Sequence, residues 1–110
     1  MSLDVSLYYV NDGHEVEVFS ANITHNLNKM AMELGAYEHL WRPEEVNVEN
    51  AKQLIPHVKE YLAELVSNPK KYKEFSPENG WGTYDGLVNF MRKYLDACIE
   101  YPNAIVKADR

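Results

Sequence analysis

Two short segments near the start of the chain alternate apolar with polar residues, which is typical of half-buried strands. Alternation runs through residues 4–10, and in residues 14–19 two valines alternate with two glutamates. The Asn-Asp-Gly sequence at 11–13 separates them, and asparagine and glycine tolerate the positive φ of tight hairpin turns. We therefore predict a β-hairpin with one side packed and the other side facing water.

Three segments further along repeat apolar residues every three or four positions, which predicts helices. The first stripe runs from Ile23 to Trp41 and ends or kinks at Gly35, because glycine suits the left-handed position after a last helical turn. The second lies at about 48–67 and the third at about 84–100. The side chains expected in the core are Leu27, Met30, Leu34, Leu54, Val58, Leu62, Leu87, Met91, Leu95 and Cys98.

Proline and capping residues refine this helical pattern. Pro56 removes a backbone donor inside the second segment, so we expect a kink there or a helix that starts near it. Asn68 and Pro69 suit the start of a short helical turn. Thr83 is the expected cap of the last helix.

The order of the elements predicts the fold class. A hairpin, three to four helical pieces and a short apolar strand at 104–108 give a single α+β domain over residues 1–110. Two strands alone are marginal, so the closing strand is expected to return and pair with the hairpin. We predict a small three-stranded antiparallel sheet with the helices packed on one face.

The charge of the chain argues against one class of partner. Its 110 residues include 17 acidic and 11 basic ones, for a net charge of −6. A free nucleic-acid binder usually has a basic face. Here the basic residues cluster only at Lys70, Lys71 and Lys73. We therefore predict no tight binding of nucleic acid at physiological salt.

The cysteine count and the hydropathy predict a soluble intracellular protein. Cys98 is the single cysteine, so no internal disulfide can form and a reducing compartment fits. No apolar run approaches the ~20 residues that a membrane span needs. The first ten residues lack the basic start and long apolar stretch of a signal peptide. We predict no membrane partner.

A polar cluster at the start of the first helical stripe is the best candidate for a site. It consists of Asn22, Thr24, His25, Asn26, Asn28 and Lys29. Asparagine is unfavourable inside helices, and the cluster exceeds what one cap requires. The histidine could transfer a proton near neutral pH, and the lysine with the helix N-terminus could hold an anion. The alternative is a solvated helix start rich in capping residues, with His25 turned away from the core.

Two further segments carry candidate ligand-binding residues. Trp41 and Arg42 adjoin two glutamates, and the planar guanidinium could bind a carboxylate or a phosphate. Asn79, Trp81 and Tyr84 lie in the one glycine-dense stretch, where the aromatic rings could stack on a planar ligand. The alternatives are a surface turn with a paired arginine, and a tight loop whose tryptophan packs into the body. We expect this loop to meet the polar cluster.

Other chemistry has little support in the sequence. The loop has the spacing GxGxxxG, which differs from the dinucleotide-binding pattern, and no GK[ST] occurs. The 4 histidines are scattered without a second ligand at a typical metal-binding spacing. Cys98 falls on the apolar stripe of the last helix, where a buried thiol is inert, and no GxSxG occurs. We predict no cofactor, no metal and no assigned catalytic residue.

Four strings of residues carry a resemblance to a known group of proteins. They are NITHNLNKMA, YEHLWRPEE, NGWGTYDGLVNFMRKYLDAC and YPNAIVKADR. In these strings the chain resembles short uncharacterised proteins of tailed bacteriophages and prophages, over nearly its whole length and in the same order. The resemblance implies a phage or prophage origin and action in the cytoplasm of a bacterial host. It implies no activity.

The function that we predict first is non-enzymatic binding of a polar small molecule or a bacterial host protein. The surface would comprise Asn22–Lys29, Trp41–Arg42 and Asn79–Tyr84. Phage accessory proteins commonly act by binding, which is an analogy only. One alternative is a small hydrolase or transferase with His25 as general base. The other is an interaction module or homodimer that uses an exposed apolar face, to which Met32, off the main stripe, points.

Overall fold

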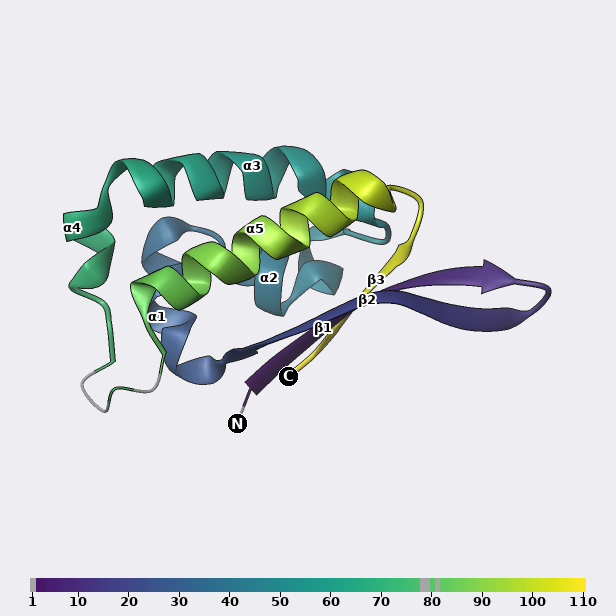
Figure 1. Cartoon of the computed structure of the whole chain (residues 1–110), viewed down its shortest axis with the longest axis horizontal. Helices are drawn as coiled ribbons and strands as arrows, with labels where there is room; N and C mark the ends of the chain where they lie inside the picture. The colour runs from purple at the N-terminus through teal and green to yellow at the C-terminus, as the bar shows by residue number, and fades with distance from the viewer. Residues whose placement is uncertain (1, 78–79, 81) are drawn as a thin grey trace.

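The computed structural model describes residues 2–77, 80 and 82–110, and it has the α+β fold that the sequence predicts (Figure 1). Its strands are β1 (Ser2–Asn11), β2 (His14–Thr24) and β3 (Ile105–Asp109). Its helices are α1 (Asn28–Leu34), α2 (Tyr37–Trp41), α3 (Ala51–Ser67), α4 (Pro69–Lys73) and α5 (Tyr84–Glu100), with 3-10 turns η1 (His25–Leu27) and η2 (Pro43–Val46).

The three strands form one antiparallel sheet in the order β2-β1-β3. The chain reverses from β1 to β2 at Asp12 and Gly13, whose φ angles are 51° and 78°. Positive φ at both central residues matches the hairpin turn that fits the twist of the two strands. β3 pairs with residues 4–8 of β1. The predicted return of the closing strand to the hairpin is therefore confirmed.

Strand β2 is longer than the alternation of residues predicted. It continues to Thr24, so Asn22 and Ile23 are strand residues, and α1 begins only at Asn28. The interpretation of Ile23 as part of a helical stripe was wrong. Ile23 and Leu27 are both buried, and their spacing of four keeps them facing the core across the junction between strand and helix. Spacing alone therefore could not distinguish this junction from a continuous helix.

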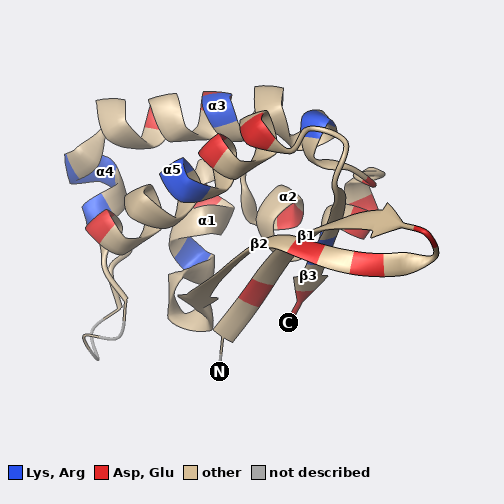
Figure 2. Cartoon of the chain, turned by 45° about the vertical axis from the view of Figure 1, so that its right-hand side comes forward, with Lys and Arg blue, Asp and Glu red and all other residues tan. Residues whose placement is uncertain are grey.

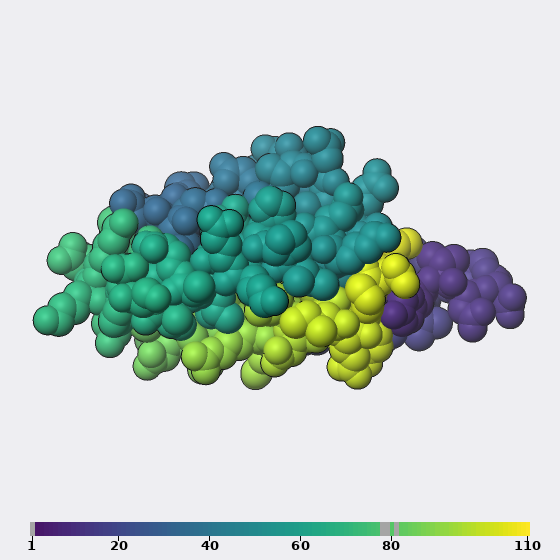
Figure 3. Space-filling model, turned by 90° about the horizontal axis from the view of Figure 1, so that it is seen from above, coloured from purple at the N-terminus to yellow at the C-terminus, as the bar shows by residue number. Residues whose placement is uncertain are grey.

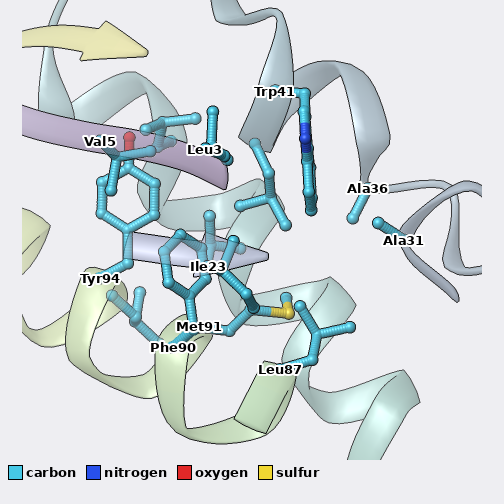
Figure 4. Close-up of a cluster of buried hydrophobic side chains, with 14 of the residues drawn as sticks. Leu3, Val5, Ile23, Ala31, Ala36, Trp41, Leu87, Phe90, Met91 and Tyr94 are labelled. Atoms are coloured by element: carbon cyan, nitrogen blue, oxygen red, sulfur yellow. The ribbon is translucent and has the colours of Figure 1, made fainter. Parts of the chain in front are cut away.

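The helices lie on one side of the sheet, and the core fills the space between these layers (Figure 1). Leu3, Val5 and Leu7 of β1 are fully buried and face the helices. Figure 4 shows side chains from β1 and β2 meeting Trp41 of α2 and Met91 of α5. Every side chain predicted for the core is buried except that of Leu62, which is partly buried.

The predicted helix ends agree with the structure at three positions. The hydroxyl of Thr83 accepts a hydrogen bond from the backbone nitrogen of Gly86 at 2.9 Å and caps α5. Gly35 ends α1 with a φ of 83°, and Pro69 is the first residue of α4. Helix α3 begins before Pro56 and continues past it, so the alternative of a start near Pro56 is wrong.

The hydroxyl group of Tyr94 gives a prediction about the core. Tyr94 is fully buried, and its hydroxyl has no hydrogen-bond partner among the described residues. A buried hydroxyl without a partner costs free energy, so Tyr94→Phe is expected to leave the free energy of unfolding unchanged or raise it by up to about 1 kcal/mol. Unfolding in urea measures this change.

Tyr84→Phe is the matched control. The hydroxyl of Tyr84 is also in a buried environment, but it donates to the carbonyl oxygen of Leu65 at 2.6 Å. Its removal leaves that carbonyl without this donor and is expected to cost about 1–3 kcal/mol. Equal losses in the two variants would contradict the assignment of Tyr94 as unpartnered.

Candidate functional site

Polar residues at the junction of η1 and α1 line an open depression of about 750 Å³. One wall consists of His25, Asn26, Asn28 and Lys29, and the other is the segment 74–77, Glu-Phe-Ser-Pro. The volume lies within the range of about 300–1,000 Å³ that is usual for small-molecule sites. Four residues of the predicted polar cluster therefore face a segment that the chain reaches only after α4.

The local sequence explains why this wall is polar. The hydroxyl of Thr24 accepts a hydrogen bond from the backbone nitrogen of Asn26 at 3.3 Å, which caps η1 where the chain leaves the sheet. Leu27 and Met30 then point into the core. The polar residues between and beside them are left on the outside, and Lys29 lies in the first turn of α1.

His25 accepts a hydrogen bond from Trp41, which lies in the core. The indole Nε1–H donates to Nδ1 of His25 at 2.9 Å. Because an indole nitrogen can only donate, Nδ1 is the acceptor, and the neutral imidazole carries its proton on Nε2. The neutral ring therefore has no free lone pair for accepting a proton, and it presents an N–H donor.

The expectation that His25 turns away from the core is met only in part, because its ring lines the open depression but also contacts Trp41. His25 is only partly exposed, and its ring contacts Trp41, which is 1% exposed. The expectation assumed about 100° of rotation per residue, as in a continuous α-helix. Residues 25–27 instead form a 3-10 turn that follows a strand, so the direction of this side chain differs.

The glycine-dense stretch reaches the same junction at Gly82. The φ of Gly82 is 98°, and a Cβ atom there would lie 2.7 Å from Cγ2 of Thr24 and 2.9 Å from Cγ of Leu27. Ser76 and Pro77, at the other end of the stretch, line the depression. Both described ends of this stretch therefore lie beside residues 24–29.

The remaining residues of the predicted polar cluster and loop have different positions. Asn22 lies on β2, where its amide donates to the hydroxyl of Ser2 at 2.8 Å and to the carboxylate of Asp4 at 2.6 Å. It does not line the depression. Asn79 and Trp81 lie outside the described residues, so their predicted meeting with the cluster stays a prediction.

Arg42 and Tyr84 also do not line the depression. Arg42 donates to the carboxylate of Glu45 at 2.9 Å and to the hydroxyl of Tyr37 at 3.3 Å. This is the paired arginine of the surface-turn alternative. The ring of Tyr84 is buried, and its hydroxyl donates to the backbone of α3.

Sequence reasoning missed the second wall of the depression. Glu74 and Phe75 follow α4, and only the packing of α4 against α1 brings them opposite Lys29. The Ser-Pro pair at 76–77 did indicate the start of a loop. Nothing in the pattern of residues indicated which surface that loop would face.

The lining combines hydrogen-bond donors, acceptors and both signs of charge. The ammonium of Lys29, the imidazole Nε2–H and two side-chain amides can donate, while the carboxylate of Glu74 and the amide oxygens can accept. Phe75 and Pro77 add apolar surface. This arrangement suits a small molecule with oxygen or nitrogen acceptors and one apolar face.

A cluster of two histidines and a tyrosine lies between α2 and α3, outside the depression. The rings of His39 and His57 stack with centroids 4.2 Å apart, and the hydroxyl of Tyr61 is 2.9 Å from Nδ1 of His39. Burial is the main cause that lowers the pKa of His39. The neighbouring His57 lowers this pKa further, and Glu38 opposes the shift.

The lowered pKa of His39 predicts a pH dependence of stability. As the pH falls below 6.5, the ordinary pKa of histidine, His39 takes up a proton in the unfolded chain at a higher pH than it does in the folded chain. The free energy of unfolding is therefore expected to fall as the pH is lowered from 6.5 toward the folded pKa. Urea unfolding over this range measures the slope, and His39→Gln is expected to make it shallower. An identical slope in the variant would contradict the assignment.

Two further observations limit the chemistry of the described residues. Cys98 is buried in α5, and burial raises the pKa of its thiol to about 12, so the thiol is protonated and inert at neutral pH. No group of three metal-ligating side chains occurs in the described part of the chain. Separately, none of its helices is both long enough and apolar enough to cross a membrane.

Comparisons of the chain with protein-family models, with curated proteins and with solved structures gave no significant match.

Proposed function

We propose that the protein binds a small polar molecule, without catalysis, in the depression between the η1–α1 junction and residues 74–77. The observation that carries this proposal is the convergence of His25, Asn26 and Lys29 with Glu74 on one concave surface. Glu74 is far in the sequence from the other three residues, and together they supply complementary donors and acceptors. An ordinary solvated helix start would not require a polar second wall.

The hydrogen bond between Trp41 and His25 favours binding over general-base catalysis. A general base needs a free lone pair within reach of the proton that it removes. The indole occupies Nδ1 of His25, and the proton on Nε2 makes the other nitrogen a donor. A fixed donor suits the recognition of an acceptor atom on a ligand.

The resemblance to bacteriophage and prophage proteins supports the setting that we propose for this binding. A phage-type accessory protein would act in the cytoplasm of a bacterial host. Sequestration of a host metabolite fits an open depression of about 750 Å³ with a mixed polar and apolar lining. The net charge of −6 supports a partner other than nucleic acid.

Thermal-shift screening with a library of polar metabolites tests the proposal. A ligand present at about a hundred times its dissociation constant adds ~2.7 kcal/mol to the free energy of unfolding. A ligand that raises the melting temperature is expected to lose this effect in Lys29→Met and in Glu74→Gln. Both residues are exposed, so neither variant is expected to change the melting temperature of the free protein by itself.

Lys59→Met is the matched control, because Lys59 is an exposed lysine of α3 that does not line the depression. It is expected to keep the full ligand-induced shift. The proposal fails if no compound of the library shifts the melting temperature. It also fails if the shifts survive in both Lys29→Met and Glu74→Gln.

A further inference from the structure

The distal part of the hairpin projects beyond the helices (Figures 1 and 3). We refer to residues 8–18 as the hairpin arm. β3 pairs only with Asp4–Tyr8 of β1, so most of the arm is a ribbon of two strands. Tyr9 meets the ring of Tyr101 edge-on with centroids 5.8 Å apart, which anchors the base of the arm to the body.

The two edges of the sheet differ in how the chain protects them. At the β3 edge, the backbone nitrogen of Val106 donates to the carbonyl oxygen of Glu49 at 3.0 Å, and Asn50 bridges to Ile105. At the β2 edge, no strand of the described residues pairs with the outer side. Proteins usually protect such edges with lysine, proline or a very short strand. β2 has 11 residues and contains neither lysine nor proline, but it carries Glu15 and Glu17, and its register against β1 shifts between Leu7 and Tyr8. Acidic side chains disfavour the addition of another acidic strand and leave the edge open to a basic one.

The arm also exposes apolar side chains that the core does not use. Val10 is 58% exposed and Val16 is 48% exposed. Val10 pairs with Glu15 and Tyr9 pairs with Val16, so the two valines lie on opposite faces of the ribbon, and Val16 is the one on the edge strand. An unpaired edge strand that exposes Val16 can both hydrogen-bond with and pack against an added strand.

The charge on the arm determines which charge an added strand should carry. The chain contains no lysine or arginine before Lys29, and the arm carries Asp12, Glu15 and Glu17. Figure 2 shows these acidic positions along the hairpin. Lys107 of β3 pairs with Glu15 at 2.6 Å, and both side chains are about half exposed. The surface beside β2 is therefore acidic, with Lys107 as the cation that pairs with Glu15, while Asp12 and Glu17 have no lysine or arginine within salt-bridge distance among the described residues.

We propose that the hairpin arm binds an extended, lysine- or arginine-bearing segment of another protein, which adds to the sheet as a strand along β2. Backbone hydrogen bonds along the edge supply affinity. Val16 contacts apolar side chains of the segment, and Glu15 and Glu17 attract its cations and select against acidic segments. A second copy of this chain would bring two acidic arms together, which disfavours self-pairing.

A synthetic peptide of about ten residues that alternates lysine with valine and threonine is the probe. It is added to the isotope-labelled protein, and amide chemical shifts and amide hydrogen exchange are recorded. The peptide is expected to shift the amide signals of β2 and to slow their exchange, and added salt is expected to weaken the binding. A peptide with glutamate in place of each lysine is expected not to bind.

Charge reversal identifies the residues responsible. Glu15→Lys with Glu17→Lys is expected to weaken binding of the lysine peptide by about tenfold or more. Glu60→Lys with Asp96→Lys makes the same change of charge on exposed helical positions and is expected to bind like the parent protein. Val16→Thr keeps charge and strand propensity, and it is also expected to weaken binding.

Three results would overturn the proposal. The first is an absence of binding, or amide shifts confined to residues outside β2. The second is equal binding of the lysine and glutamate peptides, or equal losses in the two charge-reversed proteins. The third is a dimer in sedimentation experiments whose protected amides lie on β2, because the occupant of the edge would then be a second copy.

Discussion

Replacing Trp41 by alanine is expected to lower the free energy of unfolding by about 3–5 kcal/mol, because a large buried ring is lost and leaves a cavity. Trp41 is 1% exposed and lies in the core between the helices and the sheet (Figure 4). Its ring stacks on Tyr37 with centroids 5.6 Å apart. Unfolding in urea or guanidinium measures the change.

Trp41→Phe separates packing from the hydrogen bond. Phenylalanine keeps an aromatic ring but has no N–H to donate to His25, so this variant is expected to lose clearly less than Trp41→Ala. A double-mutant cycle with His25→Ala is expected to give a coupling free energy of about 1 kcal/mol for the hydrogen bond. A loss below about 1 kcal/mol in Trp41→Ala would contradict the burial of this ring.

The sequence predicted the fold where local chemistry and periodicity agree. The hairpin follows from alternation on both sides of a turn that needs positive φ at Asp12 and Gly13. Helix α5 follows from a long apolar stripe with a capping threonine at its start. The junction after β2 was not predicted, because Ile23 and Leu27 are buried in either conformation.

Only one wall of the candidate site could be predicted from the sequence. The excess of polar residues identified His25, Asn26 and Lys29, which one short stretch brings together. The wall at residues 74–77 depends on how α4 packs against α1, which no local pattern encodes. The bond from Trp41 to His25 joins residues 16 positions apart. It depends on side-chain directions that the assumed continuous helix placed wrongly.

Gly82→Ala is expected to lower the free energy of unfolding by about 2–4 kcal/mol, from two causes that add. The φ of 98° is unfavourable for any residue with a Cβ atom. That atom would also lie within 3 Å of both Thr24 and Leu27, so the junction that carries the polar wall must move. Gly82→Ala is therefore also expected to weaken binding of any ligand found for the depression.

Gly35→Ala is the control that separates the backbone strain from the contact with Thr24 and Leu27. Gly35 has a similar φ of 83°, and no described atom lies within 4 Å of the position that its Cβ would occupy. Only the backbone term applies there, so a loss of about 1–2 kcal/mol is expected. The difference between the two variants measures how tightly Gly82 packs against the β2–η1 junction. If both variants lost the same stability, and Gly82→Ala bound ligand like the parent protein, the loop would not support the wall of the depression.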